Sequence, residues 1–270
     1  MRRRWPVLVA TIPLVFAGAL VAAYPAAAQA GLMERGGLVQ SGGPIRHLSQ
    51  PGGRNAVVTR GRNTVVTSSN WAGYAAAGAN GTFTSVSSSW TQPAGHCTGG
   101  YQYAAFWIGL DGYTSGTVEQ TGSEVDCAGR TPRYYAWYEM YPGGSVAFPN
   151  RVSPGDQFAA SVTYQGSGRF WLVLKDTTKG WTQTVSATLA GAALSSAEVI
   201  AEAPCCTARG GTLPLTNFGT VNFSSATANG RGMSTFNPVE ITMPDTSVSA
   251  LSGAGNFTVS YSGFTWPYGR

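Results

Sequence analysis

Acidic side chains inside strand-like runs are the residues of this sequence most able to do chemistry. Five of them lie in or next to such runs, namely Asp111, Glu119, Glu139, Glu198 and Glu202. A carboxylate in a buried strand must be paired, hydrogen-bonded or functional, because burying an unpaired charge is costly. Each acid alone has an ordinary structural explanation. Five acids near one set of aromatic-rich strands indicate a site.

The residue types of most other hydrolytic sites are missing. The chain has two histidines, His47 and His96, and His96 lies in a glycine-containing loop beside Cys97. No GxSxG, DTG or DSG stretch occurs, so a Ser-His-Asp, Cys-His or aspartic protease site is not expected. Neither CxxC spacing nor a histidine cluster is present, and we therefore expect no metal and no other cofactor.

The first thirty residues have the pattern of a secretory signal peptide. Arg2, Arg3 and Arg4 precede an apolar run, and residues 28–30 (Ala-Gln-Ala) fit an A-x-A cleavage site. The run is short for a membrane span, and no stop-transfer pattern follows it. We therefore expect a secreted, extracellular protein that has no membrane attachment once residues 1–30 are removed.

Residues 31–66 differ in composition from the rest of the chain. They are rich in Gly, Arg, Ser and Gln and contain no aromatic residue, so they predict a propeptide or disordered leader. Five Arg against one Glu give them a net charge of +4, whereas nine Lys and Arg against eleven acids give residues 67–270 a net charge of −2. The basic balance of the whole chain therefore does not indicate a nucleic-acid or lipid partner. An acidic cleft in residues 67–270 is one surface on which such a leader could dock.

Residues 67–270 have the length of one domain and the pattern of an all-β fold. Short runs, several of alternating polarity, are separated by Gly, Pro, Asn and Asp, and only residues 187–197 hint at a helix or, alternatively, a strand with a loop. The expected strands are Thr82–Trp90, Tyr103–Ile108, Arg133–Tyr141, Gln157–Tyr164, Arg169–Lys175, Trp181–Thr188, Ser196–Ala203, Gly219–Ser225, Val239–Thr242 and Phe257–Tyr261. Many short strands without alternating helices predict an antiparallel β-sandwich or jelly roll.

The four cysteines allow three disulfide pairings. Export to an oxidising compartment makes disulfides permissible. We favour Cys97–Cys127, which closes a loop, and this leaves the adjacent Cys205 and Cys206 to form a vicinal disulfide or to stay free.

Six stretches occur in an order and at spacings that resemble the glutamic peptidases, or eqolisins, across essentially all of residues 67–270. They are residues 69–74 (SNWAGY), 107–112 (WIGLDG), 120–122 (QTG), 135–142 (YAWYEMYP), 152–156 (VSPGD) and 197–202 (AEVIAE). The resemblance implies a concanavalin A-like sandwich of two curved antiparallel sheets, which agrees with the strand pattern. It also implies a secreted acid endopeptidase that acts on polypeptides, and we expect a monomer.

The resemblance further implies roles for individual residues. Gln120 and Glu202 match the catalytic dyad, with Glu202 as the general base for water and Gln120 as the donor to the oxyanion. Trp71 and Trp107 match substrate-pocket tryptophans, while Asp111 and Glu139 match supporting acids. Two positions depart from the family pattern. Tyr135 stands where relatives often have Asp, and Met140 stands where an aromatic residue is common.

Two other functions fit parts of the sequence. Glu139 and Glu202, with aromatic surfaces nearby, could form the carboxylate pair of a glycoside hydrolase. The same fold also supports a non-catalytic, lectin-like binding module. Loss of activity in Gln120→Ala would separate a peptidase from a two-carboxylate glycosidase, and an effect of Glu202→Gln would separate an enzyme from a binding module.

Overall fold

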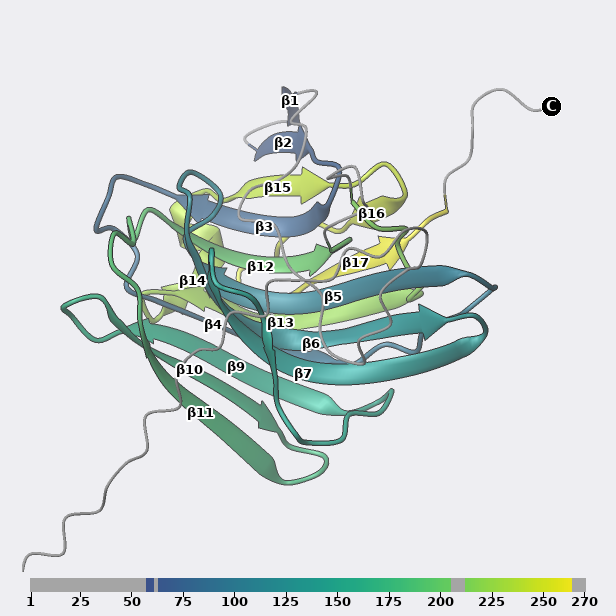
Figure 1. The fold of residues 1–270 in the computed structure, drawn as a ribbon. Coiled ribbons are helices and arrows are strands. Elements are labelled where there is room, and N and C mark those ends of the chain that lie inside the picture. The colour runs from purple at the N-terminus through teal and green to yellow at the C-terminus, as the bar shows by residue number, and fades with distance from the viewer. Residues whose placement is uncertain (1–56, 61–62, 205–211, 264–270) are drawn as a thin grey trace, which may run out of the picture. The chain divides into compact units, whose positions relative to one another are not determined.

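The structure, a computed structural model, describes residues 57–60, 63–204 and 212–263. These residues form two sheets with antiparallel neighbours throughout, except that β2 and β15 run parallel (Figure 1). The only helix in the described part of the chain is a single 3-10 turn, η1 (Met233–Phe236). The predicted all-β sandwich is confirmed, and the sheets do not close into a barrel.

Sheet A has nine strands and carries all the sequence motifs that contain candidate site residues. In spatial order it consists of β1 (Val57–Arg60), β2 (Asn63–Thr67), β15 (Val239–Thr242), β3 (Trp71–Ala77), β12 (Ser196–Glu202), β5 (Tyr101–Leu110), β6 (Val118–Ala128), β7 (Thr131–Tyr141) and β8 (Val146–Ala147). The chain therefore brings β12 between β3 and β5, although more than eighty residues separate β12 from either strand.

Sheet B covers one face of sheet A. Its order is β11 (Trp181–Thr188), β10 (Arg169–Asp176), β9 (Gln157–Tyr164), β4 (Ser85–Thr91), β13 (Thr220–Ala228), β17 (Phe257–Tyr261) and β16 (Thr246–Val248), and the short β14 (Arg231–Gly232) pairs with β13. Alternation sets the faces of its strands. Phe158, Ala160 and Val162 of β9 are buried, whereas Gln157 is exposed, as the sequence predicts.

The main core lies between the two sheets. It contains the aromatic cluster of Trp90, Phe158 and Phe223 from sheet B, in which Trp90 stacks on Phe158, together with Phe106 and Ile108 from β5 of sheet A. These side chains are almost completely buried, so their apolar surface supplies the main driving force for packing sheet A on sheet B.

Three local expectations differ from the structure. Residues 187–197 form no helix, because β11 ends at Thr188 and a loop leads to β12. β6 was not among the expected strands, since its acids, amide and glycine hide the usual apolar alternation. The segment expected to be a leader contains two strands at its C-terminal end, β1 (Val57–Arg60) and β2 (Asn63–Thr67). The backbone of β2 pairs with β15, a contact that the composition of the segment does not predict.

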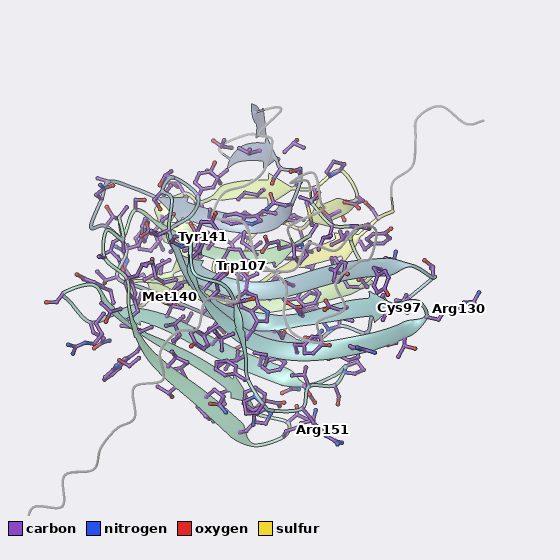
Figure 2. All side chains as sticks on the ribbon, viewed as in Figure 1. Cys97, Trp107, Arg130, Met140, Tyr141 and Arg151 are labelled. Carbon is purple, nitrogen blue, oxygen red and sulfur yellow. A yellow bond between two sulfur atoms is a disulfide. The ribbon has the colours of Figure 1, made fainter. Side chains whose placement is uncertain are left out.

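The predicted disulfide Cys97–Cys127 is present and joins two cysteines 30 residues apart. It ties the loop before β5 to the end of β6, next to the bridge between His96 and Asn217. Figure 2 labels Cys97 at this edge of the molecule. Cys205 and Cys206 lie outside the described residues.

Replacing Cys97 and Cys127 together by alanine should lower the free energy of unfolding by about 3–4 kcal/mol, because the loop is then no longer closed in the unfolded chain. Thermal unfolding followed by circular dichroism should show a midpoint lower by roughly 10 °C. Thr98→Ala, at an exposed neighbour of the bridge, is the control and should leave the midpoint unchanged. Equal midpoints for the double variant and the wild type would contradict the expectation.

Candidate active site

The face of sheet A that is turned away from sheet B carries a second cluster of buried side chains. We call it the site face. Its apolar members include Trp71, Trp107, Trp137, Ile200 and Ile241, and none of them belongs to the core between the sheets. Because strand residues alternate in direction, Glu202, Gln120 and Glu139 lie on the same face as these tryptophans. The sheet therefore brings together residues from motifs that are far apart in sequence.

Trp107 on β5 is hydrogen-bonded to Glu202 on β12. Its Nε1 donates to Glu202 Oε2 at 2.7 Å. Asn70 Nδ2, at the start of β3, lies 3.5 Å from the other carboxylate oxygen, Oε1, and Asn70 is itself held by a hydrogen bond from Ser68 Oγ to its Oδ1. Asn70 was part of a recognised motif but was not predicted as a site residue. Two donors therefore orient the Glu202 carboxylate.

Gln120 on β6 is paired with Glu139 on β7. The two residues are direct neighbours in the ladder, and Gln120 Nε2 donates to Glu139 Oε2 at 2.8 Å. This bond uses one of the two amide hydrogens of Gln120, so the other hydrogen remains for a further acceptor. Glu139 therefore sets the orientation of the Gln120 carboxamide.

The ladder places Glu202, Trp107 and Gln120 along one diagonal of the sheet. Trp107 lies opposite Ile200, two residues before Glu202, and opposite Gly122, two residues after Gln120. The in-register neighbour of Gln120 across Gly109 is Glu198, and that of Glu202 across Ala105 is Glu124. Trp107 is therefore the side chain that lies between the two members of the expected dyad.

Two glycines make room for the Trp107 side chain. A Cβ at Gly109 would lie 3.1 Å from Trp107 Cζ3 and 3.1 Å from Gln120 Cβ. A Cβ at Gly122 would lie 2.6 Å from Trp107 Cβ and 2.3 Å from the carbonyl oxygen of Phe106, too close for any side chain. At Nε1 the ring is hydrogen-bonded to Glu202, and its Cζ3 lies beside Gly109, the residue that separates Glu198 from Gln120 in the ladder. This side chain therefore accounts for Gly109 of the WIGLDG motif and contributes to the need for glycine at Gly122 of the QTG motif.

Trp71 lies beside the same pair. Its Cα is opposite that of Glu202 in the ladder of β12 and β3, and its ring meets the Trp107 ring edge-on, with centroids 5.0 Å apart. Figure 2 labels Trp107 on the ribbon of β5 and Tyr141 at the end of β7, and both pack into the site-face cluster. The structure therefore brings five of the six predicted site residues together on one face.

The sixth predicted residue, Asp111, has a different position and different contacts. It accepts hydrogen bonds from the backbone N–H groups of Leu194, at 2.7 Å, and Ser195, at 2.8 Å, and one from Ser195 Oγ. Its backbone is left-handed, with φ of 68°. These contacts join the loop after β5 to the loop before β12. Asp111 therefore acts on the site by holding the two strands that carry Trp107 and Glu202.

The comparisons with known proteins agree with this geometry. The model of the peptidase A4 family matches residues 69–261, a range that contains every residue of the site face described above. The chain belongs to the peptidase A4 (eqolisin) family. Its members and structural neighbours are glutamic endopeptidases, and this chain is an enzyme of that class. No relative was found among curated protein sequences.

Solved structures of glutamic peptidases share the fold. Scytalido-glutamic peptidase bound to a transition-state analogue inhibitor is 26% identical, covers 72% of this chain and 98% of its own, and has a TM-score of 0.61. Aspergilloglutamic peptidase from Aspergillus niger is 25% identical, covers 59% of this chain and 99% of its own, and has a TM-score of 0.52. SCP-B, an eqolisin in complex with the tripeptide Ala-Ile-His, is 24% identical with a TM-score of 0.58 and supports the fold.

The two departures from the eqolisin pattern lie in different environments. Met140 packs against the core between the sheets, so it is not part of the site face. Tyr135 lies opposite Glu124 on β6, and burial together with nearby Asp126 raises its pKa while a hydrogen bond with Arg133 lowers it. Only the change at Tyr135 therefore alters the polar surroundings of the site, on β7 and in the same row of the ladder as Glu202 and Glu124.

Two further acids, Glu198 and Glu119, are held in the neutral form. Burial raises the pKa of Glu198 well above its ordinary value, and Asp111 and Glu119 add to the shift. Burial, with nearby Asp111, likewise raises the pKa of Glu119 to about 8. Neither acid has a basic partner among the causes of its shift. The charged form of both carboxyl groups is therefore disfavoured in the folded state, and acidic medium favours the neutral form that the fold requires.

The predicted site side chains have no solvent-exposed surface in the full-length chain. Tyr113 and Tyr141 pack at the border of the cluster. Within the described ranges, no group of three or more His, Cys, Asp and Glu is arranged to hold a metal ion, and no helix there is both long and apolar enough to cross a bilayer.

Stability should fall as pH rises, and Glu119→Gln should weaken this dependence. Between pH 4.5, the ordinary value, and about 8, the folded state binds a proton at Glu119 that the unfolded state does not. The free energy of unfolding therefore decreases with pH across this window, by up to ~1.4 kcal/mol per pH unit for one proton. Urea unfolding from pH 4 to 8.5 should give a shallower slope for the variant. Glu198→Gln should act in the same direction, and slopes parallel to the wild type in both variants would contradict the assignment.

Proposed function

We propose that this glutamic peptidase is a secreted, acid-acting endopeptidase in which Glu202 and Gln120 form the catalytic dyad. The observation that carries the proposal is the position of the Trp107 indole, which is hydrogen-bonded to Glu202 at Nε1 and lies between Glu202 and Gln120 on the diagonal of the sheet. A base and a carboxamide donor are thus held on either side of one flat apolar ring. We propose that the substrate polypeptide lies over this ring, between the two groups.

Glu202 is proposed to activate the attacking water. Its carboxylate accepts a proton from the water, whose oxygen forms a bond with the carbonyl carbon of the substrate. The hydrogen bonds from Trp107 and Asn70 hold this carboxylate in one orientation. The entropic cost of orienting the base is therefore already met before the transition state forms. The protonated Glu202 then gives the proton to the departing nitrogen as the C–N bond breaks, and this yields a carboxylic acid and an amine.

Gln120 is proposed to stabilise the negative oxygen of the tetrahedral intermediate. One hydrogen of its NH₂ group is bound by Glu139, and the second is the donor for the oxyanion. Because the site is buried, a preorganised donor there contributes more than it would in water. Glu139 has the part of a positioning residue, since it fixes the plane of the carboxamide.

The geometry does not favour the two-carboxylate glycosidase. Glu139 and Glu202 lie three strands apart in the order β12, β5, β6 and β7, which is about 14 Å between the strands at ~4.8 Å per step. Glycosidase carboxyl groups are about 5–9.5 Å apart, and Glu139 is bonded to Gln120 instead. A polypeptide is the proposed substrate, and the enzyme is proposed to act as a monomer.

Gln120→Ala should lower kcat by about 10²–10³-fold, the usual loss for one oxyanion donor. Glu202→Gln should remove activity almost completely, because an amide cannot accept the proton of the water. Digestion of a denatured protein from pH 2 to 7, with pepstatin present to exclude aspartic proteases, measures both effects.

Gln92→Ala is the matched control for this experiment. Gln92 is also a buried glutamine with a bonded carboxamide, but its Nε2 is bonded to the Pro93 carbonyl in the loop after β4. Its replacement should reduce stability without removing turnover. Full activity of Glu202→Gln, or equal losses in Gln120→Ala and Gln92→Ala, would refute the dyad.

We also propose that residues 1–30 direct secretion and that the leader is removed before the enzyme acts, near Arg60 and Arg62. Two features of the sequence support this proposal: residues 1–30 have the pattern of a signal peptide, and residues 31–66 carry a net positive charge opposite to that of residues 67–270. N-terminal sequencing of the secreted, active species should begin within a few residues of Arg62. An intact leader in the active species would show that this removal is not required.

A further inference from the structure

The face of sheet B that is turned away from sheet A carries one exposed aromatic side chain. We call it the outer face. Trp171 on β10 lies there, because its neighbours Phe170 and Leu172 point into the core between the sheets. Trp171 is 50% exposed, and the only other large apolar residue exposed in the described ranges is Val146. One exposed aromatic residue is not unusual by itself, so its surroundings decide what it can bind.

Hydroxyl groups surround Trp171 on the outer face. The residues that share its row in the ladder are Ser186 on β11, Thr163 on β9 and Ser85 on β4. On the described strands β4, β9, β10, β11 and β13, no Asp or Glu points outward, and the outward-pointing cations are Arg169 and Lys175 of β10. The outer face therefore presents neutral hydrogen-bonding groups and one apolar ring, without a carboxylate.

A hollow of about 360 Å³ opens on the same face, where β9, β4 and β13 are neighbours. Its polar lining consists of Ser89, Thr91, Gln157, Thr177, Asn222 and Ser224. Each of these side chains carries a hydroxyl or a carboxamide, so the polar lining is uncharged. Among the described residues, the carboxamides of Gln157 and Asn222 have no hydrogen-bond partner, and both are therefore available to a ligand.

Trp171 and the hollow lie at a separation that the ladder sets. Ala159, which borders the hollow, is in the row of Lys175, four residues from Trp171 along β10. At ~3.3 Å per residue this separation is about 13 Å. The row between them carries the hydroxyls of Ser161 and Ser87. A ligand that contacts both the indole and the hollow must therefore be an extended chain.

We propose that the outer face binds a neutral polysaccharide, with one sugar ring packed on Trp171 and the hydroxyls of a sugar further along the chain bonded in the hollow. Sugar hydroxyls both donate and accept hydrogen bonds, as do the hydroxyls and carboxamides of the hollow. The C–H face of a sugar ring is apolar and packs on an indole, which offers a large apolar surface. A chain of several sugars spans the distance that one sugar ring cannot.

Two other occupants fit the outer face less well. An extended peptide adds to a sheet through a free strand edge, but β9, β4 and β13 each have a partner strand on both sides. A second copy of the chain would bring Arg169 and Lys175 of one molecule close to those of the other, and stable dimer interfaces are more apolar than this face. A polysaccharide needs neither a free edge nor an apolar patch.

The outer face and the site face lie on opposite sides of the sandwich. One belongs to sheet B and the other to sheet A, and each is turned away from the core between them. A polysaccharide on the outer face therefore does not contact Glu202 or Gln120, and the inference does not depend on the proposed dyad. It adds a second binding function, by which the peptidase is held on an insoluble glycan while it cuts polypeptides.

Adsorption to insoluble polysaccharides tests the proposal. The full chain is mixed with particles of cellulose, chitin or β-1,3-glucan, and the protein left in solution is measured. The wild type should bind at least one of these neutral glycans, and Trp171→Ala should bind roughly tenfold more weakly, as expected for loss of an aromatic anchor. Val146→Ala is the matched control, because it removes the other exposed apolar side chain, on β8 of sheet A, and should bind like the wild type.

A double variant, Gln157→Ala with Asn222→Ala, tests the hollow separately. Both residues are exposed, so the double variant should keep the fold, which circular dichroism checks. Isothermal titration with a soluble hexasaccharide of the bound glycan should show binding weaker by roughly tenfold, the loss expected for two neutral hydrogen bonds. Cleavage of a soluble peptide should be unchanged in this variant and in Trp171→Ala.

Salt separates this binding from adsorption by charge. At about 1 M NaCl the screening length is about 3 Å, so attraction through Arg169 and Lys175 would be lost, whereas binding to a neutral glycan should persist. Adsorption only to polygalacturonate, or adsorption that disappears in salt, would overturn the inference. Failure to bind any of the three neutral glycans would do the same, as would equal binding by the wild type, Trp171→Ala and the double variant.

Discussion

The hydrogen bond from Trp107 to Glu202 is the interaction on which the site depends. It joins the middle of β5 to the last residue of β12, and it requires these strands to be neighbours in one register. The indole ring that donates this hydrogen bond fits only because Gly109 and Gly122 have no side chain, since a Cβ at either position would lie too close to Trp107. A side chain at either glycine would move the indole, and the carboxylate that it orients would move with it.

Strand β12 shows how one segment serves both the core and the site. Ala197, Val199 and Ala201 face the core between the sheets, while Ile200 and the two acids face the other side. All seven residues of the strand are buried. A register slip of one residue would exchange the two faces and place both acids in the apolar core. The apolar packing of sheet A on sheet B thus determines where the base lies.

The acids around the site are stabilised in two different ways. Glu202 accepts a hydrogen bond from Trp107, and Glu139 accepts one from Gln120. These donors stabilise the carboxylate oxygen atoms as acceptors. Glu198 and Glu119 are instead buried with other acids nearby, and their raised pKa values keep them neutral. Acidic medium keeps these two buried acids neutral.

The amino-acid sequence by itself determined the strand class, the faces of β9 and the set of motifs that identifies a glutamic peptidase, and it favoured Cys97–Cys127 among three possible pairings. These properties follow from local alternation and residue type, which are readable without contacts. Only the tertiary structure decided that β12 inserts between β3 and β5, so that Asn70 meets Glu202 across 132 positions of sequence. It also decided that Asp111 joins two loops and that Trp171 shares the outer face of sheet B with the hollow between β9, β4 and β13. Such facts depend on which strands become neighbours, and that choice is made by packing over the whole molecule.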